Sequence, residues 1–291
     1  MTISVSPIGP TLGAIIEGID ARDLSVEDEA ALKNAFSEHR VLVLRSQSLS
    51  ADEQVAFSAR FGPLYRMPYV TPLADNPDVI AVLKEADEVN VSAFGSWWHA
   101  DFSYLEEPPV ISILQSHELP PAGGDTLFAD MCTTYDALSD GMKVMIDPLR
   151  VMHSGHIYGT QLSQDGTKER MRGVEVSTGH KEADIERAHP LVRLHPPTGR
   201  PALFASPTYT TRLDGMTADE SAPILSFLYD HMARPEFTIR QRWQEGDLLM
   251  WDNRAVVHLA VNDYDGHRRL LHRTTVGSER PIPAIDWSAR S

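Results

Sequence analysis

The chain has 291 residues, 42% of them hydrophobic, which is enough for one large domain spanning residues 1–291 with a substantial core. Its 41 acidic and 26 basic residues give a formal net charge of −15, which disfavours nucleic acid and anionic membranes as partners because phosphate binding needs clustered cations. The only cysteine, Cys132, excludes an internal disulfide, and the absence of an N-terminal signal segment or a membrane-length apolar run leads us to expect a cytoplasmic protein.

Two helices with a buried strand between them are predicted in the N-terminal part. Ser25 and Ser50 are each followed three residues later by an acidic residue, a pattern of the capping-box type that opens a helix. The second helix should end at Gly62-Pro63, which is a stop signal. Residues 40–45 are rich in Val and Leu and predict a buried strand.

The segment Trp98-His99-Ala100-Asp101 is a candidate for metal binding. On an extended strand, residues i and i+2 point to the same face, so His99 and Asp101 could both reach one ion. A third imidazole from a distant segment would complete a set of two histidines and one carboxylate, which suits Fe(II) and oxygen chemistry. The triplet alone is weak support, since a chain with 12 histidines and 41 acidic residues can contain one by chance.

The middle of the chain predicts short strands and one long polar segment. Strands are expected at residues 110–114, 191–194, 237–242 and 248–250. Residues 156–187 contain several glycines and few large apolar side chains, and a loop of this length is usually functional or disordered. We expect it to act as a lid that orders when substrate binds, with a plain surface insertion as the alternative.

A capping box formed by Thr217 and Glu220 predicts a further helix that continues through Leu225 and Leu228. Pro223 lies within this stretch, so we expect the helix to begin one turn later than the box indicates. Taken with the strands, these elements predict a β-rich core with helices around it.

The region around His258 predicts a hairpin. An apolar run at residues 247–258 is followed by an Asn-, Asp- and Gly-rich turn and by a second run at residues 268–276. On the returning strand, alternation places Arg269 and Arg273 on one face, where each guanidinium can bind a carboxylate or sulfonate through two hydrogen bonds. A solvated basic edge strand is the alternative interpretation.

Motifs along almost the whole chain match the pattern of one enzyme family. They are Leu12-Gly13-Ala14, Gly18-Ile19-Asp20, Val41-Leu42-Val43-Leu44-Arg45, Phe57-Ser58-Ala59-Arg60-Phe61-Gly62-Pro63-Leu64, Trp98-His99-Ala100-Asp101, Gly123-Gly124-Asp125-Thr126, Trp251-Asp252-Asn253-Arg254, His258 and Arg268-Arg269-Leu270-Leu271-His272-Arg273. In order and spacing, the chain resembles the taurine dioxygenase-like (TauD/TfdA) branch of the Fe(II)/2-oxoglutarate-dependent dioxygenases.

The resemblance implies a role for each matching residue. The iron ligands would be His99, Asp101 and His258. Arg269 would form the salt bridge to the distal carboxylate of 2-oxoglutarate, with the Thr126 hydroxyl as a second partner. Arg273 would face the acidic group of the substrate or share in holding the co-substrate.

The resemblance also implies the fold, the reaction and the assembly. The fold would be mainly β with flanking helices, a double-stranded β-helix or jelly roll with iron at one mouth. The reaction would consume O2 and 2-oxoglutarate and hydroxylate a small organic acid, which can cleave the acid if the new hydroxyl lies on a carbon bearing oxygen, nitrogen or sulfur. Relatives are commonly dimers or tetramers, so we expect a homo-oligomer.

Two departures from the family pattern bear on the substrate. Taurine-specific relatives have a histidine and an asparagine where this sequence places Met67 and Gly95, so taurine would lack two polar partners. The more apolar pocket predicted instead is lined by Met67, Phe94, Phe102 and Tyr104. It ends at Arg273 and favours an aryloxyalkanoate-like carboxylate, while alkyl sulfates, sulfonates or a biosynthetic carboxylate are the alternatives.

A non-catalytic protein is an alternative of another class, namely a cupin-like barrel that binds a small anion. Such a barrel would keep the metal ligands and Arg273, but it has no need for Thr126 together with Arg269, which fit a dicarboxylate. A zinc hydrolase is a further alternative, because His and Asp also bind zinc.

Overall fold

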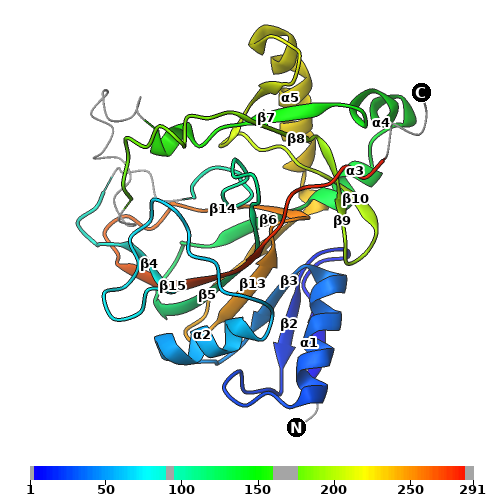
Figure 1. The fold of residues 1–291 in the computed structure, drawn as a ribbon. Coiled ribbons are helices and arrows are strands. Elements are labelled where there is room, and N and C mark those ends of the chain that lie inside the picture. The colour runs from blue at the N-terminus through cyan, green and yellow to red at the C-terminus, as the bar shows by residue number, and fades with distance from the viewer. Residues whose placement is uncertain (1–2, 90–94, 160–175, 286–291) are drawn as a thin grey trace.

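The structure is a computed structural model that describes residues 3–89, 95–159 and 176–285. Antiparallel strands form the centre of the molecule and helices lie around them (Figure 1). Among the described residues, no helix is long and apolar enough to cross a membrane. The predicted fold class, mainly β with flanking helices, is confirmed.

A seven-stranded sheet is the largest element of the fold. In spatial order its strands are β1 (Ser4–Pro7), β2 (Ala14–Glu17), β3 (Val41–Leu44), β13 (Leu248–Asp252), β5 (Pro109–Glu118), β15 (Arg269–Ser278) and β4 (Ile80–Lys84). The three-stranded sheet that packs against it consists of β12 (Thr238–Gln241), β6 (Thr126–Asp130) and β14 (Val256–Ala260). Two outer sheets consist of β11 (Thr210–Leu213), β7 (Arg150–His153) and β8 (Arg187–Pro190), and of β10 (Arg200–Leu203) and β9 (Val192–His195).

Large apolar side chains fill the space between the seven-stranded sheet and the sheet of β12, β6 and β14. Leu271 from β15 and Trp251 from β13 belong to the same buried cluster as Phe128 from β6 and Val256 from β14. The rings of Phe128 and Trp251 pack with their centroids 5.6 Å apart. Face-to-face packing of two mainly antiparallel sheets is the jelly-roll arrangement that was predicted; only β2 and β3 pair in parallel among the described strands.

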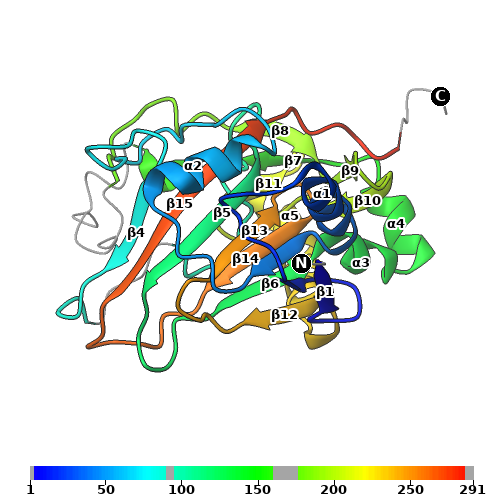
Figure 2. The same cartoon turned by 90° about the horizontal axis from the view of Figure 1, so that it is seen from below.

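The first two helices begin where the sequence predicted. The helix α1 (Val26–His39) starts directly after Ser25, and α2 (Ala51–Ala59) starts directly after Ser50. Each serine hydroxyl accepts a hydrogen bond from the backbone N–H three residues later, which satisfies a donor that the helix itself leaves unpaired. As Figure 2 shows, α1 and α2 lie beside the seven-stranded sheet. The remaining described helices are α3 (Met131–Asp136), α4 (Asp140–Ile146), α5 (Ala218–Met232) and the 3-10 turns η1 (His156–Tyr158) and η3 (Pro235–Phe237).

The predicted delay in the start of α5 is wrong. The helix begins directly after Thr217, and the complete capping box with Glu220 is present. Pro223 lies inside the helix and cannot donate to the carbonyl of Asp219. Because Asp219 is exposed, water can take the place of the missing donor, and the helix tolerates the proline.

The predicted hairpin around His258 is also wrong, although the strands themselves exist. The apolar run of residues 247–258 is broken by a turn at residues 253–255, so that it forms β13 in the large sheet and β14 in the facing sheet. β14 pairs with β6, whereas β15 pairs with β5 and β4. The connection therefore crosses between sheets, because turn residues fix where a chain reverses but not which sheet the next strand joins.

Because two histidines are buried, we expect the protein to lose stability in acid. Burial lowers the pKa of His153 to about 3 and the pKa of His189 to about 4, below the ordinary value of about 6.5. The unfolded chain then binds more protons than the folded chain, so the free energy of unfolding should fall as the pH drops from about 6.5 towards about 4. We expect a loss of about 2 kcal/mol for each ring between about pH 7 and about pH 5, measured by urea unfolding.

The variant His153→Gln isolates the contribution of one ring. Its free energy of unfolding should depend less steeply on pH than that of the wild type over the same interval, whatever the cost of the substitution at neutral pH. An equally steep dependence would show that the acid sensitivity comes from other groups.

Candidate metal centre

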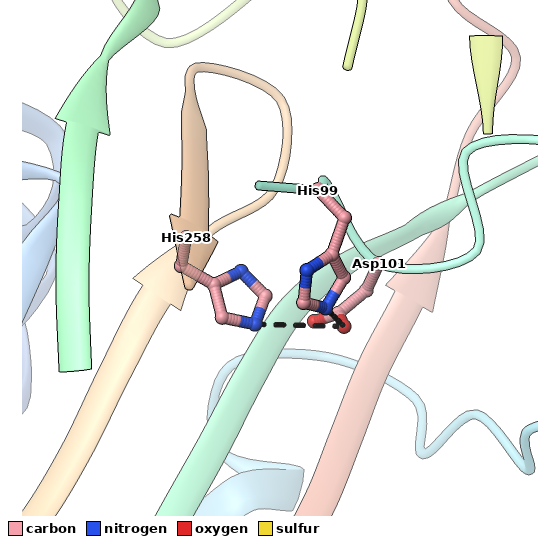
Figure 3. Close-up of side chains that lie close together, drawn as sticks. All are labelled: His99, Asp101 and His258. Carbon is pink, nitrogen blue, oxygen red and sulfur yellow. Dashed lines mark ion pairs between the residues drawn. The ribbon is translucent and has the colours of Figure 1, made fainter. Parts of the chain in front are cut away.

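Three buried side chains meet at one end of the space between the sheets. They are His99, Asp101 and His258, and their ligand atoms all lie within 4.8 Å of one another. Figure 3 shows the two imidazole rings next to each other and close to the carboxylate, with the Nε2 atoms of His99 and His258 at 3.6 Å and 3.9 Å from Oδ1 of Asp101. Within the described part of the chain, this is the only group of three or more such ligands close enough to hold one ion.

The local backbone differs from the predicted extended strand. His99 forms an isolated antiparallel bridge with His258, with N···O distances of 3.0 Å and 2.8 Å, and Asp101 already lies in a turn. Phe102 completes the turn with a φ of 47°, in the left-handed region. The turn and the bridge together bring both ligands to the same point, which the predicted alternation alone does not explain.

The protonation of the three groups fits a divalent metal. Nδ1 of His99 lies 2.7 Å from the carbonyl oxygen of Trp97 and donates to it, which leaves Nε2 with a lone pair directed at the centre. Burial lowers the pKa of both rings, so both are neutral at pH 7. Burial would raise the pKa of Asp101, but the charge of Arg273 and the hydrogen bond from Ser112 bring it below its usual range. Two neutral imidazoles and one carboxylate are a ligand set that suits Fe(II).

Two residues to which the sequence analysis assigned no role hold Asp101 in place. The hydroxyl of Ser112 donates to Oδ2 of Asp101 at 2.6 Å, and the amide of Asn253 donates to the Ser112 hydroxyl at 3.0 Å. Oδ1 of Asn253 accepts from the backbone N–H of Asp101 and from the indole of Trp251. The available signal was a polar residue inside an apolar strand for Ser112 and a matching family motif, Trp251-Asp252-Asn253-Arg254, for Asn253. Such outer contacts fix the orientation of a metal ligand.

Arg273 lies beside the metal ligands and is almost fully buried. Its Nη2 is 2.7 Å from Oδ2 of Asp101 and 2.8 Å from the hydroxyl of Ser112, while Nε has no hydrogen-bond partner among the described residues. The predicted contact of Arg273 with the substrate or co-substrate stays a prediction. The structure adds that the same guanidinium neutralises the metal-binding carboxylate.

Arg269 and Thr126 line the same cavity as the two histidines, together with Arg273 and Gly95. The guanidinium of Arg269 lies 5.6 Å from the ring of Trp243 and 5.8 Å from the ring of Tyr264. The indole of Trp243 donates to the Thr126 hydroxyl at 3.0 Å. Trp243 therefore positions both residues, whereas the sequence analysis gave it no role.

An aromatic cluster forms another wall near the centre. Phe102 stacks on Tyr158 with ring centroids 5.4 Å apart, and Tyr209 meets the ring of His99 edge-on at 6.3 Å. Met67 belongs to the same buried cluster as Phe102 and Tyr104. Of the predicted apolar pocket, Phe94 lies outside the described residues.

The predicted lid is described only in part, because residues 160–175 lie outside the described residues. Its C-terminal end contacts the aromatic cluster. The ring of His180 stacks on Tyr69 with centroids 4.2 Å apart, and Ala183 is buried in the cluster. Closure on substrate binding stays a prediction.

Comparison with known proteins agrees with this geometry. A family model described as "Taurine catabolism dioxygenase TauD, TfdA family" matches residues 4–275. An alkylsulfatase from Acinetobacter baylyi is 35% identical over 92% of this chain and 83% of its own length. An alpha-ketoglutarate-dependent 2,4-dichlorophenoxyacetate dioxygenase from Cupriavidus pinatubonensis is 32% identical over 94% of this chain and 98% of its own.

A solved structure shows the same fold. The crystal structure of a taurine dioxygenase from Burkholderia xenovorans superposes with a TM-score of 0.79 at 30% identity, covering 97% of this chain and 93% of that chain. The motifs, the sheets and the buried triad thus agree with the family match over nearly the whole length. The chain belongs to the TauD, TfdA family of dioxygenases.

Proposed function

We propose that this protein is an Fe(II)- and 2-oxoglutarate-dependent dioxygenase that hydroxylates a small organic acid and can thereby cleave it. The observation that carries the proposal is one cavity lined both by the histidines of the triad and by a buried arginine, Arg269, that forms no salt bridge with a carboxylate of the described residues. A dicarboxylate fits such a cavity, because one end can reach the metal while the other pairs with the arginine.

His99, Asp101 and His258 would hold the iron, which when bound supplies oxygen activation coupled to the oxidative decarboxylation of 2-oxoglutarate to succinate. Arg269 would bind the distal carboxylate, with the Thr126 hydroxyl as a second donor. Nε of Arg269 has no hydrogen-bond partner in the described structure, so it can donate to this carboxylate. The apolar walls exclude water and strengthen each of these charge interactions.

We propose an aryloxyalkanoate-like carboxylate as the substrate, bound between the aromatic cluster and Arg273. Phe102, Tyr158 and Tyr209 offer aromatic surfaces near the metal ligands. A Cβ in place of the Gly95 hydrogen would lie 3.1 Å from the ring of His99 at a φ of +81°, so an amine-binding amide at this position would crowd a metal ligand. One relative is named for an aryloxyacetate, 2,4-dichlorophenoxyacetate, and another is named an alkylsulfatase. Alkyl sulfates are therefore the competing substrate class.

Succinate release from the iron-loaded protein tests this proposal. The assay supplies 2-oxoglutarate and oxygen with an aryloxyalkanoate, an alkyl sulfate or taurine, and follows the loss of each acid. We expect succinate to form in step with loss of the aryloxyalkanoate. Faster consumption of the alkyl sulfate would contradict the proposed substrate class, but it would still support the proposed dioxygenase reaction. Failure to bind 2-oxoglutarate would favour the non-catalytic anion-binding barrel.

We also propose that the protein is a homo-oligomer, a dimer or a tetramer. Sedimentation velocity would test this, and a single species with the mass of one chain would contradict it.

The close approach of Gly124 to Arg269 gives a specific prediction. A Cβ at Gly124 would lie 3.1 Å from Cδ and 3.2 Å from Nε of Arg269, at a φ of +69°. Gly124→Ala should displace the guanidinium of Arg269 and weaken the binding of 2-oxoglutarate by about 1–2 kcal/mol. The KM for 2-oxoglutarate should then rise by about tenfold. Gly215→Ala is the matched control, because Gly215 has a similar φ of +77° and open space around it. An equal rise of KM in both variants would contradict the contact.

A further inference from the structure

A pair of histidines lies on the face of the large sheet that points away from the metal centre. His117 on β5 and His272 on β15 have ring centroids 4.0 Å apart with an interplanar angle of 49°. Alternation along β15 directs Leu271 and Arg273 towards the metal centre, so His272 points to the opposite face. On that face the hydroxyl of Thr274 contacts Ser58 of α2 at 2.6 Å.

A bulge in the strand pairing accounts for this juxtaposition. Leu270 pairs with Glu118 and Leu271 pairs with Ser116, which leaves His117 as an extra residue on β5. A β-bulge bends the strand and changes the direction of the side chain at that point. Here the extra residue is the one whose ring meets His272.

One buried nitrogen of each ring is unpaired among the described residues. Nε2 of His117 and Nδ1 of His272 are shielded from solvent and have no hydrogen-bond partner among the described residues. Oε1 of Gln54 and Oε1 of Gln115 are likewise buried and unpartnered. Gln115 is the cross-strand partner of His272, and Gln54 donates to the backbone carbonyl of His272 at 3.2 Å. Unpaired buried polar atoms are costly, so their presence on two neighbouring histidines and on two glutamines next to His272 indicates that a ligand satisfies some of them.

The protonation of the pair suits a metal ion. Burial lowers the pKa of both rings, that of His272 to about 4, so both present neutral lone pairs at pH 7. The carboxylate of Asp75 lies near enough to oppose the shift of His272 and adds a negative charge for a cation. Imidazole nitrogens bind Zn²⁺, Ni²⁺ and Cu²⁺ well.

We propose that His117 and His272 form a second site for a divalent transition metal such as Zn²⁺, separate from the iron site. An ion bound there would link β5 to β15, the strands that carry Ser112 and Arg273. The site does not depend on the proposed dioxygenase activity.

Equilibrium dialysis of the metal-free protein against Zn²⁺ at neutral pH, followed by metal analysis, tests the proposal. Because Zn²⁺ also binds His and Asp ligands, we expect two equivalents in the wild type and one in His99→Ala. His117→Gln and His272→Gln should each bind one equivalent, and His99→Ala combined with His117→Gln should bind none. His267→Gln, which changes an exposed histidine, should retain two. Two equivalents in both His117→Gln and His272→Gln would overturn the proposal.

A second measurement guards against misfolded variants. In the His99→Ala background, Zn²⁺ should raise the melting temperature, because an ion that binds only the folded state stabilises it. The rise should disappear when His117→Gln is added and persist when His267→Gln is added. An equal rise in both double variants would show that the ion binds elsewhere.

Discussion

Replacing His99 by alanine should abolish stoichiometric Fe(II) binding and lower kcat/KM by about 10³-fold or more, because metal catalysis supplies several kcal/mol of transition-state stabilisation. The substitution removes one of three ligands that lie within 4.8 Å of one another. The backbone bridge between His99 and His258 uses only main-chain atoms, so it should survive. Anaerobic iron titration and succinate release measure the two effects.

Ser112→Ala separates the loss of a ligand from the loss of its support. Ser112 donates to Asp101 at 2.6 Å but does not belong to the triad. Its removal should weaken iron binding by about 10- to 100-fold, which is typical of a partner that only orients a metal ligand. Circular dichroism and thermal unfolding establish that each variant is folded. If folded His99→Ala bound iron as tightly as the wild type, the triad would not be the iron site.

The sequence predicted the triad because its chemistry depends on residue types at fixed positions. His99 and Asp101 lie within one short motif, and the family pattern supplied His258 from far along the chain. The residues that support them could not be predicted in this way. Ser112 is one polar residue on a buried strand, and only the pairing of β5 with β13 shows that it faces Asp101.

The fold was predictable at the level of elements and less so at the level of their pairing. Ser25, Ser50 and Thr217 marked helix starts because a cap acts within four residues of its own position. The assignment of β14 and β15 to different sheets depends on contacts with β6, β5 and β4, which no local pattern encodes. The aromatic wall of Tyr158 and Tyr209 was missed for the same reason.

Arg269→Gln should raise the KM for 2-oxoglutarate by about 10²-fold or more, because losing one partner of a buried charge pair costs about 2–5 kcal/mol. Arg269 is 4% exposed, and no acidic side chain within the described structure forms a salt bridge with it. Arg269→Lys keeps the charge but loses the paired hydrogen bonds, so its KM should lie between those of the wild type and Arg269→Gln. Steady-state succinate formation at varied 2-oxoglutarate measures the effect.

Arg268→Gln is the matched control on the adjacent residue. Arg268 pairs with Glu85 and Glu118 outside the cavity, so its loss should leave the KM for 2-oxoglutarate within about twofold, as expected for a surface ion pair. Iron binding should be unchanged in both variants, because neither arginine contacts the triad in the described structure. A KM that rises equally in Arg268→Gln and Arg269→Gln would mean that general electrostatic attraction, rather than a specific salt bridge, holds the co-substrate.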